Sequence, residues 1–151
     1  MGFEIDGLDE MTEALNMVQD LYPKKVKKFM MKEGNKLKRS TLKAVKSSTL
    51  RKVTGNYEKG IKRGKPYEYD ITGAASIRVY SNANHAHLIE EGHEIVLHGK
   101  GNRKRRKERN GTGQFTRAYH LFRRAANEFE SVYETDSEKF ALEIVEPLNR
   151  G

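Results

Sequence analysis

Histidines and carboxylates gather in one short stretch of the sequence. The candidate ligands in it are His85, His87, Glu90, Glu91 and His93. Imidazole and carboxylate groups are the ordinary ligands of zinc, and neighbouring carboxylates suggest acid–base chemistry. His87 and Glu91 are four residues apart, and Glu90 and His93 are three apart, which are helical spacings. A weak metal site on one face of a helix is therefore one interpretation of the stretch.

A structural interpretation fits the same residues better. Their order is not the His-Glu-x-x-His pattern that sets two imidazoles one turn apart with a base between them. The two adjacent glutamates point about 100° apart on a helix. Ala86 and Ile89 are expected to anchor a short helical turn in the core. Gly92 is expected to supply a positive φ, and Glu90 to pair with a nearby donor or another subunit.

Other signatures of enzymes are missing from the sequence. It has no cysteine, which excludes thiolate metal sites and a disulfide framework. It has no Gly-x-Ser-x-Gly elbow. The glycines between residues 55 and 60 form neither a phosphate-binding loop nor a dinucleotide fingerprint. We therefore expect no catalytic residue, no metal and no cofactor, and a protein that is not an enzyme.

Helical periodicity predicts amphipathic helices toward both ends of the chain. A short helix is predicted over 8–20, and Pro23 is well placed to begin a long helix that reaches about Ser48. The C-terminal pattern fits two helices, the second capped by residues 135–137, or one unbroken helix over 117–146. The apolar stripe of the long helix comprises Val26, Phe29, Met30, Leu37, Thr41, Ala44 and Val45.

The middle of the chain is predicted to form a sheet. The alternating segments 67–71 and 77–79 predict two strands joined across 72–75. Residues 95–97 form a third candidate strand. Residues 98–113, rich in glycine and basic residues, are predicted to be a mobile basic loop.

These elements together predict an α+β fold. A short N-terminal helix and a long amphipathic helix precede a small antiparallel sheet, and a C-terminal helix or helix pair follows it. A length of 151 residues fits a single domain over 1–151. The longest apolar runs are only a few residues, and the acidic N-terminus lacks the layout of a signal peptide, so we expect no membrane contact and no secretion.

Two segments supply the net charge of +8. Residues 23–52 hold twelve bases and one acid, and residues 100–109 hold seven bases and one acid, whereas residues 1–22 hold six acids and no base. Basic patches of this kind attract polyanions through long-range fields and counterion release. The bases expected to contact a partner or DNA are Arg103, Lys104, Arg105, Arg106, Lys107 and Arg109.

Three interpretations of the basic loop stay open. It contacts DNA phosphates without sequence preference, it orders against an acidic surface of a neighbouring protein, or it is a solvated loop. The absence of aromatic residues from the run argues against recognition of single strands. The lysines that line one face of the long helix also have two interpretations. They form an ordinary solvated surface, or in an oligomer they meet the acids of segment 4–13 in an adjacent copy.

Two motifs, in their order along the chain, resemble those of a known family. Residues 54–57 resemble a Thr-Gly-x-Leu motif, with tyrosine in place of leucine. Residues 85–93 resemble a Tyr-Ala-x-x-Val-Glu-x-Gly motif followed by His or Thr, with His85 where tyrosine is usual. The chain is similar over nearly its whole length to the tail-completion family of long-tailed phages, typified by gene product ten of phage Hong Kong ninety-seven. The residues that carry the resemblance are Thr54, Gly55, Tyr57, Ala86, Ile89, Glu90, Gly92 and His93.

The resemblance implies a structural protein of the virion. Such a protein completes the head-proximal end of the tail and joins it to the capsid connector at the neck. It is expected to work as a homo-oligomeric ring, with six-fold symmetry favoured, beside other neck, connector and tail-tube proteins, and to be made in the bacterial cytoplasm. Non-specific contact with packaged DNA is a further expectation. The alternative function is that of a small basic nucleic-acid-binding protein without enzymatic activity, although no helix-turn-helix is found.

Overall fold

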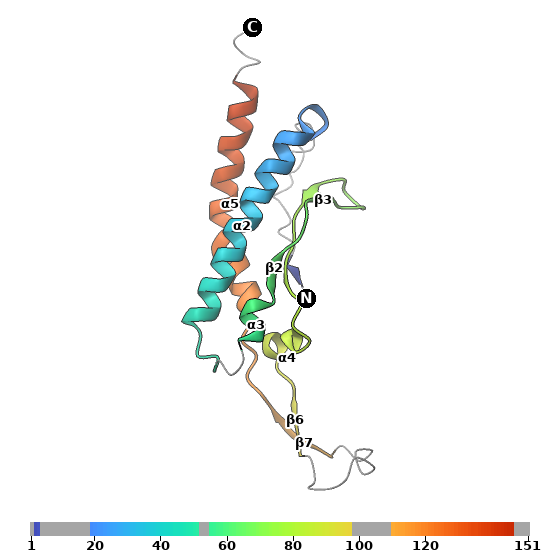
Figure 1. Ribbon diagram of the computed structural model, residues 1–151, viewed down its shortest axis with the longest axis vertical. Coiled ribbons are helices and arrows are strands. Elements are labelled where there is room, and N and C mark those ends of the chain that lie inside the picture. The colour runs from blue at the N-terminus through green and yellow to red at the C-terminus, as the bar shows by residue number, and fades with distance from the viewer. Residues whose placement is uncertain (1, 4–18, 52–54, 98–109, 147–151) are drawn as a thin grey trace.

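The computed structural model describes residues 2–3, 19–51, 55–97 and 110–146, which form two long helices and several small antiparallel sheets (Figure 1). This arrangement confirms the predicted α+β fold. Within these residues, no helix combines the length and apolar character needed to cross a membrane. The elements in chain order are β1 (Gly2–Phe3), α2 (Pro23–Ser47), α3 (Asn56–Lys59), β2 (Ile61–Arg63), β3 (Tyr67–Glu68), β4 (Ala75–Ser76), β5 (Val79–Ser81), α4 (Ala86–Glu91), β6 (Glu94–Leu97), β7 (Asn110–Phe115) and α5 (Leu121–Val145).

Helices α2 and α5 pack side by side and run in opposite directions (Figure 1). Pro23 begins α2, as predicted, because its fixed φ suits the first helical position and its missing N–H is not needed there. The whole predicted apolar stripe of α2 is buried. At the seam, the rings of Phe29 and Phe140 stack with centroids 4.4 Å apart. Residues 19–21 are helical, whereas the rest of the helix predicted over 8–20 lies outside the described residues.

The C-terminal segment is one unbroken helix, α5, which begins at Leu121 and not at residue 117. The predicted cap at residues 135–137 is therefore wrong. The Thr135 hydroxyl donates to the Ser131 carbonyl one turn earlier, Asp136 pairs with Lys36 of α2, and Ser137 is buried. Because Thr135 and Asp136 have partners and the small Ser137 side chain fits into the packed interior, nothing ends the helix there.

The sheets differ from the prediction in their pairing. β3 pairs with β4 in a short hairpin, which the Gly73 N–H closes by donating to the Tyr69 carbonyl. Ile71 is therefore 83% exposed in the turn instead of lying in a strand. Val79 begins a separate strand, β5, which pairs with β1 and with β2. Sequence periodicity missed β1 and β2 because strands of two or three residues show no alternation.

Gly34, in the middle of α2, faces side chains that leave little room for a Cβ. A Cβ at Gly34 would lie 2.6 Å from Cδ1 of Ile77 and 2.9 Å from Cδ of Arg63. A side chain at position 34 would therefore require Ile77 and Arg63 to shift. This close contact offsets part of the cost of glycine in a helix, which is about 1 kcal/mol relative to alanine.

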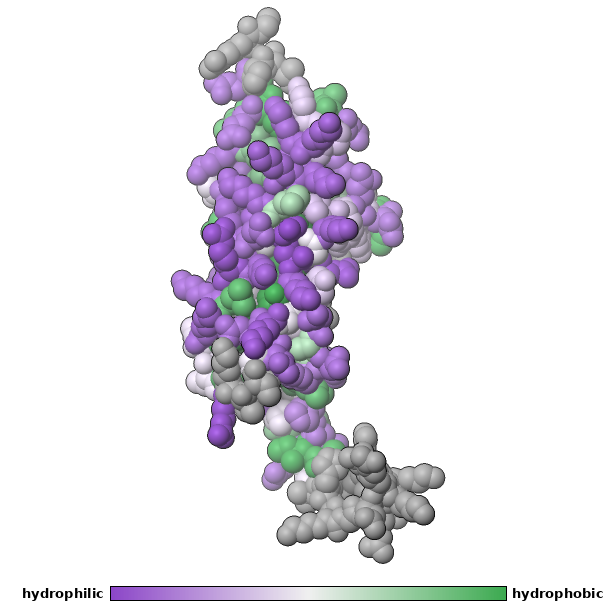
Figure 2. Space-filling model, in the orientation of Figure 1, coloured by the Kyte–Doolittle hydropathy of each residue, from purple (hydrophilic) through white to green (hydrophobic). Residues whose placement is uncertain are grey.

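Strands β6 and β7 form an arm that projects from the rest of the molecule (Figures 1 and 2). The prediction of β6 is confirmed, but the predicted loop over 98–113 is too long, since residues 110–113 belong to β7. Because β7 contains Gly111 and Gly113, its sequence resembles a loop, and the strand was not predicted. The Glu94 side chain covers Gly111 and its Oε1 accepts a hydrogen bond from the Gly113 N–H at 3.0 Å. The remainder of the predicted loop, 98–109, lies outside the described residues.

A charged cluster bridges the two long helices. Lys36 Nζ lies 3.0 Å from Oε1 of Glu33, which is only 2% exposed, and it also pairs with Asp136 of α5. Burial raises the pKa of Glu33, because the charged form loses its hydration. The hydrogen bond from Lys36 lowers the pKa of Asp136. Lys36 thus pairs with two carboxyl groups at the seam between the helices, Asp136 with a lowered pKa and Glu33 with a raised pKa.

Glu33 and Asp136 should have opposite effects on how the free energy of unfolding changes with pH. A raised folded pKa costs stability that grows as pH rises from the unfolded pKa to the folded pKa, so Glu33→Gln should gain stability relative to the unchanged protein as pH rises above 4.5, the ordinary pKa of glutamate. A lowered folded pKa contributes stability above the unfolded pKa, so Asp136→Asn should lose about 1–2 kcal/mol near neutrality and nothing below its folded pKa. Urea unfolding at several pH values measures both differences. Parallel pH profiles for the two variants would contradict this assignment.

Candidate functional site

The glutamate at the centre of the histidine-rich stretch, Glu90, is buried inside its own subunit. Its side chain lies on α4 and is 1% exposed. Oε1 accepts hydrogen bonds from the Tyr57 hydroxyl at 2.5 Å and from the Leu121 N–H at 3.1 Å. Oε2 accepts one from the Phe122 N–H at 3.3 Å. Three donors from two distant segments therefore satisfy one buried carboxylate.

Glu90 acts as the N-terminal cap of α5, although it is far away in sequence. The residue before α5, His120, has φ 48° and its side chain makes no capping hydrogen bond. The N–H groups of Leu121 and Phe122 point instead at the Glu90 carboxylate, whose charge is favoured at the positive end of a helix. Backbone bonds support the same junction, since Tyr119 N–H donates to the Ile89 carbonyl at 3.0 Å and His120 N–H to the Glu90 carbonyl at 3.2 Å.

Tyr57 brings a third segment to this junction. Its side chain is 5% exposed and comes from α3, which follows Gly55 in the left-handed conformation with φ 72°. Burial and the Glu90 carboxylate raise the pKa of Tyr57 well above its ordinary value. The phenol therefore stays protonated and works as a permanent hydrogen-bond donor. The ring also meets Phe122 edge to face, with centroids 6.5 Å apart.

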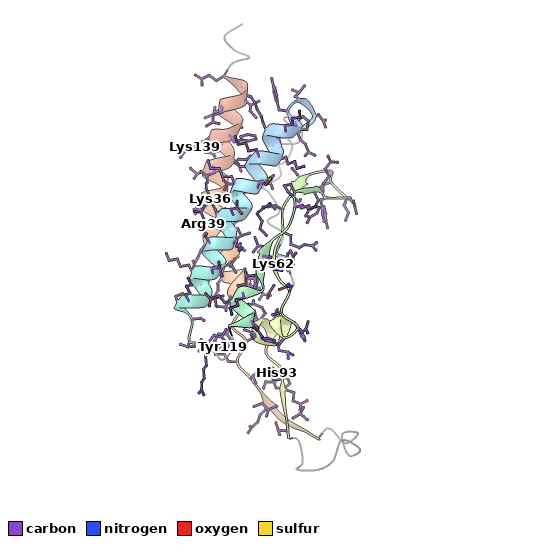
Figure 3. All side chains as sticks on the ribbon, viewed as in Figure 1. Lys36, Arg39, Lys62, His93, Tyr119 and Lys139 are labelled. Carbon is purple, nitrogen blue, oxygen red and sulfur yellow. The ribbon has the colours of Figure 1, made fainter. Side chains whose placement is uncertain are left out.

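Gly92 turns the chain from α4 into the projecting arm. Its φ is 71°, as predicted, and a Cβ there would lie 2.6 Å from the Thr116 carbonyl oxygen. The two strands of the arm begin at this point. His93 N–H donates to Thr116 Oγ1 at 3.0 Å, and Thr116 N–H donates to the His93 carbonyl at 2.8 Å. Figure 3 shows His93 and Tyr119 at the base of the arm, where it leaves the body.

The structure brings some of the predicted site residues together and separates others. Gly55, Tyr57, Ala86, Ile89 and Glu90 share one junction, and Ala86 is buried and Ile89 packs against the core, as predicted. Glu90 finds its donors inside the subunit, so it has no need of a partner from another. His93 lies on the exposed arm. The predicted residues Thr54 and Arg103, Lys104, Arg105, Arg106, Lys107 and Arg109 lie outside the described residues.

The histidines do not converge on a metal site in the described part of the chain. No group of three or more histidine, aspartate or glutamate side chains there is arranged to hold a metal ion. His85, His87 and Glu91 are exposed, whereas Glu90 is buried. A mainly apolar pocket of about 480 Å³ lies beside the junction, lined in part by Val45, Leu50, Tyr57 and Ile89, but Glu90 is not in its wall. The geometry of this site is that of a structural junction.

Sequence reasoning missed the partners of Glu90 because two of them are backbone N–H groups. A weak signal was present in the sequence. The four residues before Leu121, Arg-Ala-Tyr-His, include no serine, threonine, aspartate or asparagine that could cap a helix. A helix without a local cap needs an acceptor from elsewhere, and the buried carboxylate of Glu90 fills that need.

The junction should respond to the loss of a single hydroxyl. Tyr57→Phe removes one donor to a buried charge and should lower the free energy of unfolding by about 2 kcal/mol. Glu90→Gln places an amide against backbone donors and should cost about 3 kcal/mol. Because the residues are in contact, the double variant should lose less than both single losses together. Chemical unfolding measures all three, with Tyr80→Phe as a control, and full additivity would contradict the coupling.

Gly92 should be far less replaceable than Gly73, a second glycine with a positive φ. Gly73 has φ 66°, and no atom lies within 4 Å of the place that a Cβ would take, so Gly73→Ala should cost about 1 kcal/mol, from backbone strain alone. Gly92→Ala adds the collision with Thr116, and at Gly92 a ψ of 174° together with the positive φ lies in a region that is essentially open only to glycine. This variant should cost at least about 2 kcal/mol more. Thermal unfolding compares the two variants. Equal losses would show that the chain relieves the collision by moving the base of the arm.

Comparison with known proteins adds the family. Residues 9–92 match the HK97-gp10-like family, described as "Bacteriophage HK97-gp10, putative tail-component". The match includes α2, α3, the strands β2 to β5, α4 and Gly92, and ends where the arm begins. No curated protein and no solved structure matches the chain. Since the match covers more than half of the 151 residues, this chain belongs to the HK97-gp10-like family of phage tail components.

Proposed function

We propose that this protein is a non-enzymatic component of the phage neck, which completes the head-proximal end of the tail and joins it to the capsid connector. Membership in a family of phage tail components carries the proposal and implies a place in the virion. The proposed working form is a homo-oligomeric ring, with six-fold symmetry favoured, in contact with neighbouring connector and tail-tube proteins.

The geometry of the Glu90 junction supports a structural role. Its carboxylate is 1% exposed and accepts three hydrogen bonds from its own chain. A general acid or base needs a path for the proton and for the substrate, and this group offers neither. The junction instead ties α3, α4 and the start of α5 together, at the point where the arm leaves the body.

The arm supports a role in contacts with neighbours. An isolated two-stranded hairpin is marginally stable in water and leaves both strand edges unpaired. Phe115 is 72% exposed and Ile95 is 37% exposed on this arm. Leu97 and Asn110, which flank the basic segment in the sequence, are partners at the far end of the arm. We propose that the arm carries this segment to a neck protein or to the packaged DNA.

A complementation experiment tests the proposed function. A phage lacking this chain should yield filled capsids and separate tails, and purified protein added to the extract should restore joined, infectious particles. Replacing Arg103, Lys104, Arg105 and Arg106 by alanine should reduce joining at least about tenfold, because the proposal gives these bases the contact with a neck protein or DNA. An unchanged melting temperature is the control for folding. Normal joining in the absence of the chain would overturn the proposal.

The alternative, a small nucleic-acid-binding protein, predicts a different outcome. It rests on the basic residues of α2 and of segment 100–109. Sedimentation in low and physiological salt, with and without duplex DNA, separates the two functions. A discrete ring without DNA supports the neck component. A monomer that retards DNA, with a steep loss of affinity as salt rises, supports the alternative.

A further inference from the structure

The two long helices expose faces at opposite edges of the fold. Helix α2 packs on β2 and β5, whereas α5 packs on β1. The sheet has the order β1-β5-β2, so each helix covers a different edge. Each also has a face turned away from the seam between them, and those two faces have opposite charge.

The outward face of α2 is basic. Lys36 marks the side of α2 that meets α5, since it pairs with Asp136. Lys38 is two residues further on, which places it about 200° around the helix. Positions three and four residues apart continue this row along the helix. We call it the basic row, and it comprises Lys24, Lys27, Met31, Asn35 and Lys38. The row borders β2, since Asn35 Oδ1 accepts a hydrogen bond from Arg63 Nε at 2.8 Å and Lys38 is half-buried.

The outward face of α5 is acidic. Asp136 marks the side of α5 that meets α2, and Glu134 and Glu138 each lie about 200° from it. The same helical spacing extends the row in both directions. We call it the acidic row, and it comprises Asn127, Glu130, Glu134, Glu138, Leu142 and Val145. The basic residue Arg123 stands at the same spacing before Asn127, so the acidic part of the row begins at Glu130.

Both rows also carry apolar side chains that the subunit leaves uncovered. Leu142 is 69% exposed and Val145 is 42% exposed on α5, and Met31 is 38% exposed on α2. A lysine face alone would suit DNA as well as protein. An acidic row with exposed apolar residues at its end suits only a protein surface, and it repels DNA. A second copy of this chain offers a matching basic row with its own apolar side chain.

The two rows also match in position along the helix axes. Because α2 and α5 are antiparallel, one residue forward along α2 corresponds to one residue back along α5. From the pair Lys36 and Asp136, two such steps bring Lys38 level with Glu134. Met31 is level with the stretch from Glu138 to Leu142. A rotation about an axis parallel to the helices keeps these levels, so the same residues would meet between neighbouring copies.

We infer that the basic row of α2 docks against the acidic row of α5 in the next copy, as the repeating head-to-tail contact of a ring. This inference rests on the proposed function, which it deepens by naming the contact. Heterologous contacts of this kind close into rings when the rotation between copies divides a full turn. Within one subunit the two rows face away from each other, with both helices between them, so only two copies can bring them together. Figure 3 labels Lys36 on α2 and Lys139 on α5, the two helices that form the seam.

Cross-linking tests the contact directly, because the chain has no cysteine. Full-length Met31→Cys and Leu142→Cys proteins are mixed and treated with a short bismaleimide. The mixture should yield a cross-linked dimer containing one of each variant, at least about five times the dimer from either variant alone. Equal yields from the mixture and from the single variants would overturn the contact, whether or not the protein forms a ring.

Charge reversal distinguishes this partner from DNA. Lys38→Glu and Glu134→Lys should each weaken self-association about tenfold, measured by sedimentation at physiological salt, because like charges would face each other. The double variant should recover to within about threefold of the original. Lys65→Glu is the control for net charge and should associate normally. Failure of the double variant to recover would overturn the contact, and a loss of DNA retention in Lys38→Glu that the double variant shares would assign the row to DNA.

The outcomes separate this inference from the proposed function. A discrete ring without the 31–142 cross-link would overturn the contact and leave the neck component standing. The cross-link in open chains without a closed ring would support the contact and contradict the ring. Equal melting temperatures for all variants confirm that the subunit itself is unchanged.

Discussion

The buried carboxylate of Glu90 is the constraint on which the rest of this fold depends. A charged group can stay in a protein interior only if donors satisfy it. Here they are the Tyr57 hydroxyl and the first two N–H groups of α5. The same contact solves a second problem, since α5 has no local cap and its N-terminus is buried with Leu121 fully inaccessible. The Glu90 carboxylate therefore ties α3 and α4 to the start of α5.

The arm follows from that junction. Once α4 and α5 share the Glu90 contact, the chain between them must leave the body and return within a narrow space. Gly92 makes the exit with a conformation that side chains disfavour and at a distance from Thr116 that a Cβ would not permit. The hairpin then holds itself together with cross-strand contacts such as Glu94 to Gly113. A rigid base with a projecting hairpin suits a protein that must contact neighbours beyond its own surface.

The inner side of the helix pair α2 and α5 is packed, whereas its outer sides are charged. The inner side is tied by stacked aromatic rings and by Lys36, which spans Glu33 and Asp136. The outer sides keep their charge, basic on α2 and acidic on α5. Because exposed ion pairs within a subunit add little stability, charge separated in this way has more effect between subunits, where it steers and orients association. This is the physical link from the composition of the chain to its proposed assembly.

Local pattern in the sequence is enough for the long elements. The apolar stripe of α2, the start at Pro23, the turn-helix over residues 86–91 and the positive φ of Gly92 are all predictable, because each depends on periodicity or on one residue type. The sequence also marks Glu90 as a residue that needs a donor. It leaves open the choice between one C-terminal helix and two, because Thr135, Asp136 and Ser137 resemble a cap until their tertiary partners are known.

Tertiary structure alone decided the pairings. Strands as short as β1 and β2 carry no readable alternation, and β5 pairs with them and not with β3 because the hairpin turn closes early at Gly73. The glycines of β7 resemble a loop in the sequence, and only the fold brings the Glu94 side chain over Gly111. The donors to Glu90 come from more than thirty residues away on both sides, and two of them are backbone groups that nearly every residue possesses. No sequence pattern marks such donors, because only the packed chain determines which backbone groups are left without a partner.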